Sequence, residues 1–220
     1  MSGGYVDLSV TPRGVGDLKA IASTARRMGY TVLGAPTGVA GAPTCVDGVL
    51  VVPRYVVRAS TRREAARGLA SAPRGALVVV EAESQDVARY AAVNKRVDVL
   101  RLPYRMLRLV DRSTARLFRE RGWGLVEVSL RPITEGRLGL LARLFTALRR
   151  AEAYSVPLAL VSDADGPLGL WHPYSLAGLA SLSGLPIERG LALASTAPRR
   201  ALARRRLGPG CPAGRAGGSA

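Results

Sequence analysis

The segment covering residues 123–164 has the pattern strand, helix, strand, and it constrains the fold more than any other part of the chain. A strand is predicted in Trp-Gly-Leu-Val-Glu-Val-Ser-Leu-Arg-Pro, a long helix over about 134–154, and a second strand over 158–161. Apolar side chains recur at helical spacing in the helix, at Leu138, Leu141, Leu144, Phe145 and Leu148. The second strand is a short apolar run, which is typical of parallel strands buried on both faces. Parallel strands joined by a helix make a right-handed βαβ unit.

Strands and helices alternate through most of the remaining sequence. Further strands are predicted over residues 5–10, 30–33, 49–58, 76–81 and 97–102. Pro53 predicts that its strand is bent, lies at an edge or ends early, and residues 34–48 predict a mobile loop. After Ala164 no eighth strand is as clear as the other seven. We therefore expect an α/β fold of the TIM-barrel-like (β/α) class, with a doubly wound open sheet as the alternative.

The length of 220 residues suits one barrel, so we expect a single domain over residues 1–206 with a basic C-terminal end. Pro198 is expected to interrupt the last helix before that basic end. Residues 207–220 are rich in Gly, Pro and Ala and predict a disordered tail. Cys45 and Cys211 are far apart, and we expect neither a disulfide framework nor a CxxC metal site. No apolar run of membrane-spanning length and no signal peptide is evident, which predicts a soluble cytoplasmic protein.

Charge restricts the function more than any motif does. The chain has 32 basic and 16 acidic residues, a net charge of +16 at pH 7, which is typical of a nucleic-acid-binding protein. The single histidine, His172, excludes multi-histidine metal catalysis and leaves the serines without a base. A carboxylate-only Mg²⁺ site stays open as an alternative, although structural roles are commoner for its candidates, Asp7, Glu81, Asp98, Glu127 and Asp163.

Several basic residues fall at or near the ends of predicted strands. The candidate RNA-binding residues are Arg58, Lys95, Arg101, Arg105 and Arg131, with Arg199 and Arg200 extending the surface. Because barrel strands all point the same way, we expect these cations to gather on one face. Aromatic residues make up only 5% of the chain, so recognition of the backbone and shape of folded RNA is expected rather than base stacking.

Two C-terminal helices are rich in leucine. They are predicted over about 173–183 and 186–195, and the candidate partner-binding residues are Leu176, Leu179 and Leu182. Ordinary packing of these leucines on the barrel is the alternative. An exposed apolar patch is usual only where a partner covers it.

Four segments, taken together in order and spacing, resemble a known family. They are Val-Asp-Val-Leu-Arg-Leu-Pro at 97–103, the Trp-Gly-Leu-Val-Glu-Val-Ser-Leu-Arg-Pro-Ile stretch from Trp123, Pro-Leu-Ala-Leu-Val-Ser-Asp-Ala at 157–164, and Thr-Ala-Pro-Arg-Arg-Ala-Leu at 196–202. Over roughly residues 5–203 the chain resembles protein component 3 of archaeal and eukaryotic ribonuclease P. The resemblance implies a barrel akin to the polymerase and histidinol phosphatase (PHP) metallohydrolases. Ser9 stands where a metal-binding relative would carry histidines.

The resemblance implies a noncatalytic subunit that binds the catalytic RNA and supports 5′ processing of precursor tRNA. It implies no cofactor and no active site in this chain, with Mg²⁺ ions held by the RNA subunit. The implied partners are ribonuclease P RNA, a small RRM-like subunit and other ribonuclease P proteins, with indirect contact to precursor tRNA and none to a membrane. After Ala164, Gly-Pro-Leu-Gly-Leu-Trp-His-Pro replaces a more charged loop. Alternatives are a small metal-dependent phosphoesterase of the PHP-like class and a general RNA chaperone.

Overall fold

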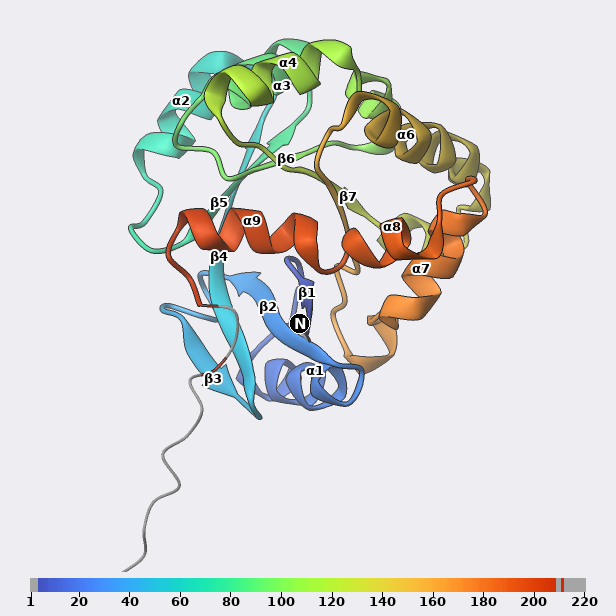
Figure 1. The fold of residues 1–220 in the computed structure, drawn as a ribbon. Helices are drawn as coiled ribbons and strands as arrows, with labels where there is room; N and C mark the ends of the chain where they lie inside the picture. The colour runs from blue at the N-terminus through green and yellow to red at the C-terminus, as the bar shows by residue number, and fades with distance from the viewer. Residues whose placement is uncertain (1–3, 209–210, 212–220) are drawn as a thin grey trace, which may run out of the picture.

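Seven parallel strands form a nearly closed barrel at the centre of the molecule (Figure 1). The computed structural model describes residues 4–208 and 211. The parallel strands are β1 (Tyr5–Asp7), β2 (Tyr30–Pro36), β4 (Val49–Ala59), β5 (Leu77–Ala82), β6 (Val99–Arg101), β7 (Val126–Ser129) and β8 (Leu158–Val161). They neighbour one another in chain order, as in a TIM-like barrel, whereas a doubly wound sheet reverses its order at a switch point. The predicted fold class is confirmed.

The barrel closes just beyond the ends of β1 and β8. Val10 and Ala164 form a parallel bridge, and the backbone N–H of Asp163 donates to the Ser9 carbonyl oxygen at 2.9 Å. At the other end of β1, the Val6 N–H donates instead to the Ala194 carbonyl oxygen at 2.7 Å. Only one end of the β1–β8 seam is therefore paired directly.

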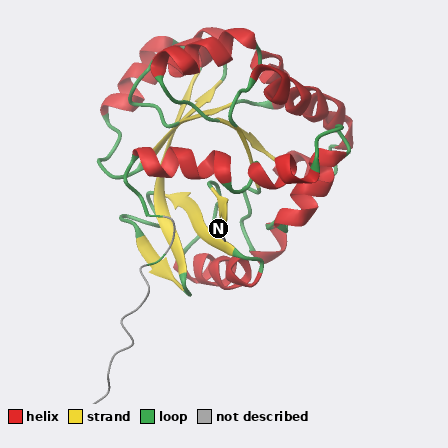
Figure 2. Cartoon of the chain, in the orientation of Figure 1, coloured by secondary structure: helices red, strands yellow, loops and turns green. Residues whose placement is uncertain are grey.

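Helices surround the barrel and cover the outer face of its sheet (Figure 2). In chain order they are α1 (Val15–Arg27), α2 (Arg62–Ala70), α3 (Gln85–Val93), α4 (Arg112–Arg121), α5 (Arg131–Thr134), α6 (Leu141–Tyr154), α7 (Pro173–Ser181), α8 (Ile187–Ala192) and α9 (Thr196–Arg204). Three 3-10 turns, η1 (Tyr104–Leu109), η2 (Leu138–Leu140) and η3 (Pro167–Gly169), connect them. No helix in the described part of the chain is long and apolar enough to cross a membrane.

Helix α9 crosses one mouth of the barrel, at the amino ends of the strands (Figure 1). Its Ala201 and Leu202 pack with the interior side chains of the strands, such as Leu50 and Leu125. Beyond these apolar contacts, Arg204 Nη1 and Arg205 Nε lie 2.5 and 2.7 Å from the two carboxylate oxygens of Asp98, which is fully buried. The helix is thus held over the mouth by both apolar burial and ion pairs.

Four predictions about individual elements differ from the structure. The predicted mobile loop at 34–48 contains the end of β2 and a short strand, β3 (Thr44–Val46), which runs antiparallel to β4. Pro53 does not end its strand: β4 runs through it between β2 and β5. Proline removes only one N–H from the ladder, and its restricted φ is compatible with an extended chain.

The predicted helix over 134–154 is divided. Gly136 has a φ of 85°, in the left-handed region that ends a helix, and α6 begins only at Leu141. Leu138, predicted for the core, is therefore 61% exposed. Pro198 lies in the first turn of α9 and does not interrupt it, because the N–H groups of a first turn have no intrahelical partner.

The two cysteines form a disulfide, contrary to the expectation from the sequence. Cys45, in β3, is bonded to Cys211, with Cα atoms 5.7 Å apart across a separation of 166 residues. Leu207 also packs against the barrel interior, and the structure describes three residues of the predicted tail: Leu207, Gly208 and Cys211. Residues 209–210 and 212–220 lie outside the described part of the chain. Spacing along a sequence does not reveal which distant segments the fold brings together.

We expect the disulfide to contribute about 2–5 kcal/mol to stability, because it closes a long loop in the unfolded chain. Cys45→Ser should lower the denaturant midpoint by the corresponding amount. Reductant should lower the midpoint of the wild type to that of Cys45→Ser and leave the variant unchanged. An equal midpoint for oxidised and reduced wild type would contradict the prediction.

Candidate functional site at the carboxyl end of the barrel

Charged side chains follow apolar ones along the interior of the barrel. Side chains alternate between the faces of a strand, and in β4 the inward series runs Leu50, Val52 and then Arg54. Four other strands make the same change from apolar to charged toward their carboxyl ends. We call the set the charged layer: Arg54, Glu81, Arg101, Glu127 and Asp163. This layer separates the apolar interior from the carboxyl-end surface.

Arg54 and Glu127 form a two-pronged ion pair across the barrel interior. Arg54 Nη1 and Nη2 each lie 2.6 Å from an oxygen of Glu127, and Nη1 also donates to the Leu8 carbonyl oxygen at 2.7 Å. The two side chains are 2% and 0% exposed. Removing one partner of such a pair leaves an unpaired charge in the interior, which is strongly destabilising. Each residue therefore requires the other.

Arg101 joins the charged layer to Asp163. Its Nη1 donates to one Asp163 oxygen at 3.1 Å, its Nη2 contacts the other, and it lies 3.5 Å from Glu127. Burial alone would raise the pKa of Asp163, but the charges of Arg101 and Arg54 and the hydrogen bonds to Asp163 together hold that pKa below its ordinary value. Burial would likewise lower the pKa of Arg101, while Glu127 and Asp163 raise it. Arg101 is therefore charged, but its charge is balanced inside the protein.

Outside the charged layer, two adjoining cavities of about 500 and 420 Å³ form a groove between η1 and α6. Tyr104, Arg105 and Arg143 line both cavities. Besides Arg101, the arginines that line this carboxyl-end groove are Arg105, Arg108, Arg131, Arg137, Arg143 and Arg150. The groove lies where (β/α) barrels present functional residues.

The groove arginines fall into two groups. Near the charged layer, Arg131 pairs with Glu135 and Asp165 at 2.9 and 3.1 Å, and Arg137 lies 3.8 Å from Glu135. The other four groove arginines, by contrast, form no ion pair with an acid within residues 4–208: Arg105, Arg108, Arg143 and Arg150. Like charges gathered in this way repel one another unless an anion lies among them. This end of the groove is therefore the candidate site for phosphate.

The predicted RNA-binding residues do not share one face, so the expectation of a single basic surface is wrong. Arg58, Arg101, Arg105 and Arg131 lie at the carboxyl end, where Arg58 pairs with Glu81 at 3.2 Å. Lys95, Arg199 and Arg200 lie at the amino end, because Lys95 precedes β6 and α9 crosses the opposite mouth. Residues before and after a parallel strand lie at opposite ends of a barrel.

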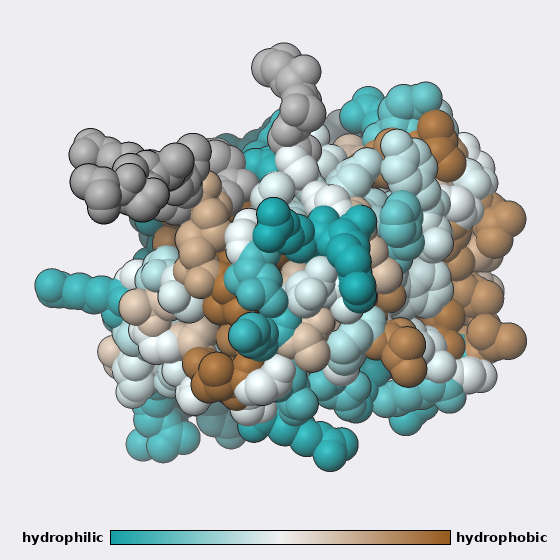
Figure 3. Space-filling view, turned by 90° about the horizontal axis from the view of Figure 1, so that it is seen from below, coloured by the Kyte–Doolittle hydropathy of each residue, from teal (hydrophilic) through white to brown (hydrophobic). Residues whose placement is uncertain are grey.

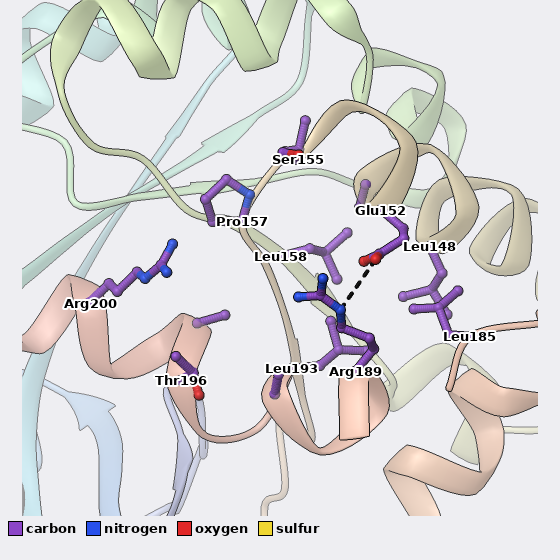
Figure 4. Close-up of a pocket in the computed structure, with 14 residues that line it drawn as sticks. Leu148, Glu152, Ser155, Pro157, Leu158, Leu185, Arg189, Leu193, Thr196 and Arg200 are labelled. Carbon is purple, nitrogen blue, oxygen red and sulfur yellow. Dashed lines mark ion pairs between the residues drawn. The ribbon is translucent and has the colours of Figure 1, made fainter. Parts of the chain in front are cut away.

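Arg199 and Arg200 have different surroundings on α9. Arg199 Nη2 donates to the Gly4 carbonyl oxygen at 2.5 Å and to Thr31 Oγ1 at 3.1 Å. Arg200 lines a cavity of about 310 Å³ bordered by α6, α8 and α9. Figure 4 shows Arg200 on one side of this cavity and the ion pair between Arg189 and Glu152 on the other. Neither predicted residue contributes to the carboxyl-end groove.

Arg143 and Arg150 were not predicted as site residues from the sequence. These residues lie seven positions apart on α6, so they share one face of the helix. On an amphipathic helix such arginines are expected on the charged face opposite the core. Only the packing of α6 against η1 shows that Arg105 and Arg108 face the same groove.

The carboxylates proposed for a metal site are bonded to other side chains or backbone groups, and one of them, Asp98, lies at the other end of the barrel. Glu127 and Asp163 are held by arginines, and Asp98 lies at the amino end with Arg204 and Arg205. Across residues 4–208 and 211, no group of three or more His, Cys, Asp or Glu side chains is placed to hold a metal ion.

The predicted partner-binding leucines differ in exposure. Leu176 is 2% exposed and packs in the core, so the prediction that it is available to a partner is wrong. Leu179 is half-buried, and Leu182 is 72% exposed. Other exposed apolar side chains near α7 and α8 are Leu168 and Ile187. Figure 3 shows hydrophobic surface along the edge of the molecule on which α7 lies.

Fold and site together define a TIM-like parallel barrel with an arginine-rich carboxyl end. Residues 4–208 match the model of the family described as RNase P subunit p30. The chain belongs to this family, which includes ribonuclease P protein component 3 of archaea. The resemblance identified from the four sequence segments is thereby confirmed.

Individual relatives agree with this assignment. Ribonuclease P protein component 3 of Aeropyrum pernix is 40% identical over 190 residues, which cover 83% of this chain and 89% of that protein. The namesake protein of Methanosarcina acetivorans is 33% identical over 144 residues, which cover 61% and 58%. A chain in the cryo-EM structure of archaeal ribonuclease P with mature tRNA has a TM-score of 0.69 at 14% identity, covering 91% and 90%. This last likeness is one of fold.

Asp7 is expected to make stability depend on pH. Burial raises its pKa to about 7, although its carboxylate accepts backbone hydrogen bonds from Ser9 and Ser162 at 3.0 and 3.1 Å. The unfolded value is about 3.9, so between about pH 4 and 7 the folded state binds the extra proton. The contribution of Asp7 to stability is therefore fully present below about pH 4 and falls as pH rises, by up to about 1.4 kcal/mol per pH unit.

Asp7→Asn removes this titration. The unfolding free energy of the variant minus that of the wild type should therefore increase as pH rises through this range. Urea unfolding of both proteins on either side of the range measures it. A difference that does not change with pH would show that Asp7 has its ordinary pKa in the folded state.

Proposed function

We propose that the protein is a noncatalytic subunit of ribonuclease P that binds the catalytic RNA and supports 5′ processing of precursor tRNA. The observation that carries this proposal is the carboxyl-end groove, where Arg105, Arg108, Arg143 and Arg150 have no acidic partner within residues 4–208. Family membership supports ribonuclease P RNA as the partner. The net charge of +16 supports a polyanion in general.

Arginine suits this role because its planar guanidinium donates two parallel hydrogen bonds to a phosphate. Arg143 and Arg150 line one wall of the groove and Arg105 and Arg108 the other, so a phosphate backbone lying along the groove would meet cations on both sides. Such contacts position an RNA without reading its sequence. Recognition in this proposal depends on the shape of the folded RNA.

Catalysis in this proposal belongs to the RNA subunit and its Mg²⁺ ions, and this chain holds no cofactor. Support comes from the charged layer, in which guanidinium groups occupy the positions next to Glu127 and Asp163 that a metal would need. The Ser9 hydroxyl also donates to Asp163. The proposal would fail if the purified chain alone hydrolysed phosphoesters with Mg²⁺ or Mn²⁺ and Asp163→Asn abolished that activity.

Further partners follow from the same proposal. In this proposal, the small RRM-like subunit docks on the apolar surface of α7 and α8, around the exposed Leu182 and Ile187. Other ribonuclease P proteins complete the particle, and contact with precursor tRNA is indirect.

The groove is tested by the double variant Arg105→Ala/Arg143→Ala in binding to ribonuclease P RNA. Each lost phosphate contact should weaken binding and flatten the plot of log K against log salt concentration by just under about one unit. The preference among RNA sequences should not change. Filter binding over a range of salt concentrations measures both quantities.

The matched control is Arg63→Ala/Arg67→Ala, which removes two exposed arginines from α2 that make no ion pair within the described residues. This control should bind RNA nearly as the wild type does. Equal losses in the two double variants would mean that binding depends on overall charge, and the groove would have no special role.

Leu182→Glu should abolish copurification with the small subunit while leaving the denaturation midpoint nearly unchanged, because the side chain is already exposed. Val15→Glu on α1 is the matched control, since Val15 and Leu182 are both 72% exposed. Persistent binding by Leu182→Glu would place the docking site elsewhere.

A further inference from the structure

A second cluster of cations surrounds a cavity of about 290 Å³ at the amino end of the barrel. Five of its eight lining residues are basic: Arg74, Lys95, Arg96, Arg204 and Arg205. The other three, Ala72, Pro73 and Val78, carry no charge. We call this site the amino-end cavity.

One carboxylate offsets this charge only in part. Asp98 binds Arg204 and Arg205 and also accepts the Val78 N–H at 2.7 Å. Arg74, Lys95 and Arg96 are exposed and form no ion pair within residues 4–208. Five cations against one anion leave a surplus of four positive charges around a small space. An oxoanion in the cavity would relieve their mutual repulsion.

The walls of the cavity are held in place before any ligand arrives. Arg204 Nη2 contacts the Lys95 carbonyl oxygen, and Arg205 Nη2 donates to the Arg96 carbonyl oxygen at 3.0 Å. The Arg204 guanidinium also lies 3.4 Å from the centre of the Trp123 ring. These contacts fasten the turn before β6 to α9, and a preorganised site loses less entropy on binding.

The amino-end cavity and the carboxyl-end groove lie at opposite ends of the same strands. Val78, in β5, lines the cavity, while Glu81 in β5 and Arg101 in β6 line the groove. The barrel wall separates the two sites. The two sites therefore open at opposite ends of the barrel.

We propose that the amino-end cavity binds the phosphate backbone of a second RNA segment, so that the protein bridges two separate segments of RNA. This rests on the proposed function for its first contact, in the carboxyl-end groove. The cavity supplies the second contact, through the side chains of Lys95, Arg96 and Arg74. The guanidinium groups of Arg204 and Arg205 add positive potential but stay bound to Asp98.

The test is hydroxyl-radical footprinting of ribonuclease P RNA with the full chain and three double variants: Lys95→Ala/Arg96→Ala, Arg105→Ala/Arg143→Ala, and the control Arg63→Ala/Arg67→Ala. The first two should each lose protection, at two different sets of nucleotides, and the control should lose none. Lys95→Ala/Arg96→Ala should also flatten the salt dependence by about one to two units. Because Lys95 and Arg96 are both exposed, this variant should fold normally, and its thermal denaturation checks that it does.

Several results would overturn the bridging proposal. Loss of protection at the same nucleotides in both variants would mean that one RNA segment contacts both sites. An unchanged footprint for Lys95→Ala/Arg96→Ala would mean that no RNA contacts the cavity. Binding of inorganic phosphate is measured separately, from NMR shifts of the amides at positions 95 and 96. If Lys95→Ala/Arg96→Ala loses this binding but keeps the normal RNA footprint, the cavity is a site for free anions and not for RNA. A normal footprint for Arg105→Ala/Arg143→Ala alone would instead contradict the proposed groove and leave the cavity contact standing.

Discussion

The ion pair between Arg54 and Glu127 is the interaction on which the arrangement at the carboxyl end depends. It joins β4 to β7 through the interior, at distances of 2.6 Å and with almost no exposure. Two charges in this position are costly to remove from water, and the cost is offset only while both are present and hydrogen-bonded. An apolar pair of similar volume would serve stability as well or better. The effect of the ion pair between Arg54 and Glu127 is to fix side-chain positions, because each guanidinium and carboxylate has a specified partner.

The fixed partners determine which arginines face outward with unbalanced charge. Arg101 is drawn inward by Asp163 and Glu127, and Arg131 is balanced by Glu135 and Asp165. The positive potential is left on η1 and α6, whose groove arginines have no acidic partner within residues 4–208. Acidic residues thus shape the basic surface by neutralising its inner part. A count of basic residues alone cannot locate such a surface.

Local features of the fold were readable from the sequence. The alternation of strands and helices follows from periodicity within short segments, and Thr61 with Glu64 forms the kind of capping box that starts a helix. The seven-stranded barrel and its family were predictable for this reason. The break at Gly136 was harder to predict, because a single glycine in a sequence does not show whether it will take the left-handed conformation that separates α5 from α6.

Long-range features were not readable. Arg54 could have been noticed as a charge at an inward position of an apolar strand, but its partner is 73 residues away. Arg101 was predicted as a phosphate ligand, yet its contact with Asp163, 62 residues distant, balances its charge inside the protein. Likewise, Leu176 and Leu182 look alike in a leucine-rich segment, and only the packing of α7 separates the buried one from the exposed one.

The position of α9 has a consequence for the order in which the protein becomes complete. The helix comprises residues 196–204, but it covers an interior lined by strands that begin at Tyr5. While the chain is being made from its amino end, every strand exists before the helix that covers their shared mouth. A nascent chain that has not reached Thr196 leaves apolar groups such as Leu50 and Leu125 open to water, along with the unpaired carboxylate of Asp98. Completion of the core therefore waits until α9 has been synthesised, and a chain cut short before α9 is exposed to aggregation throughout its life.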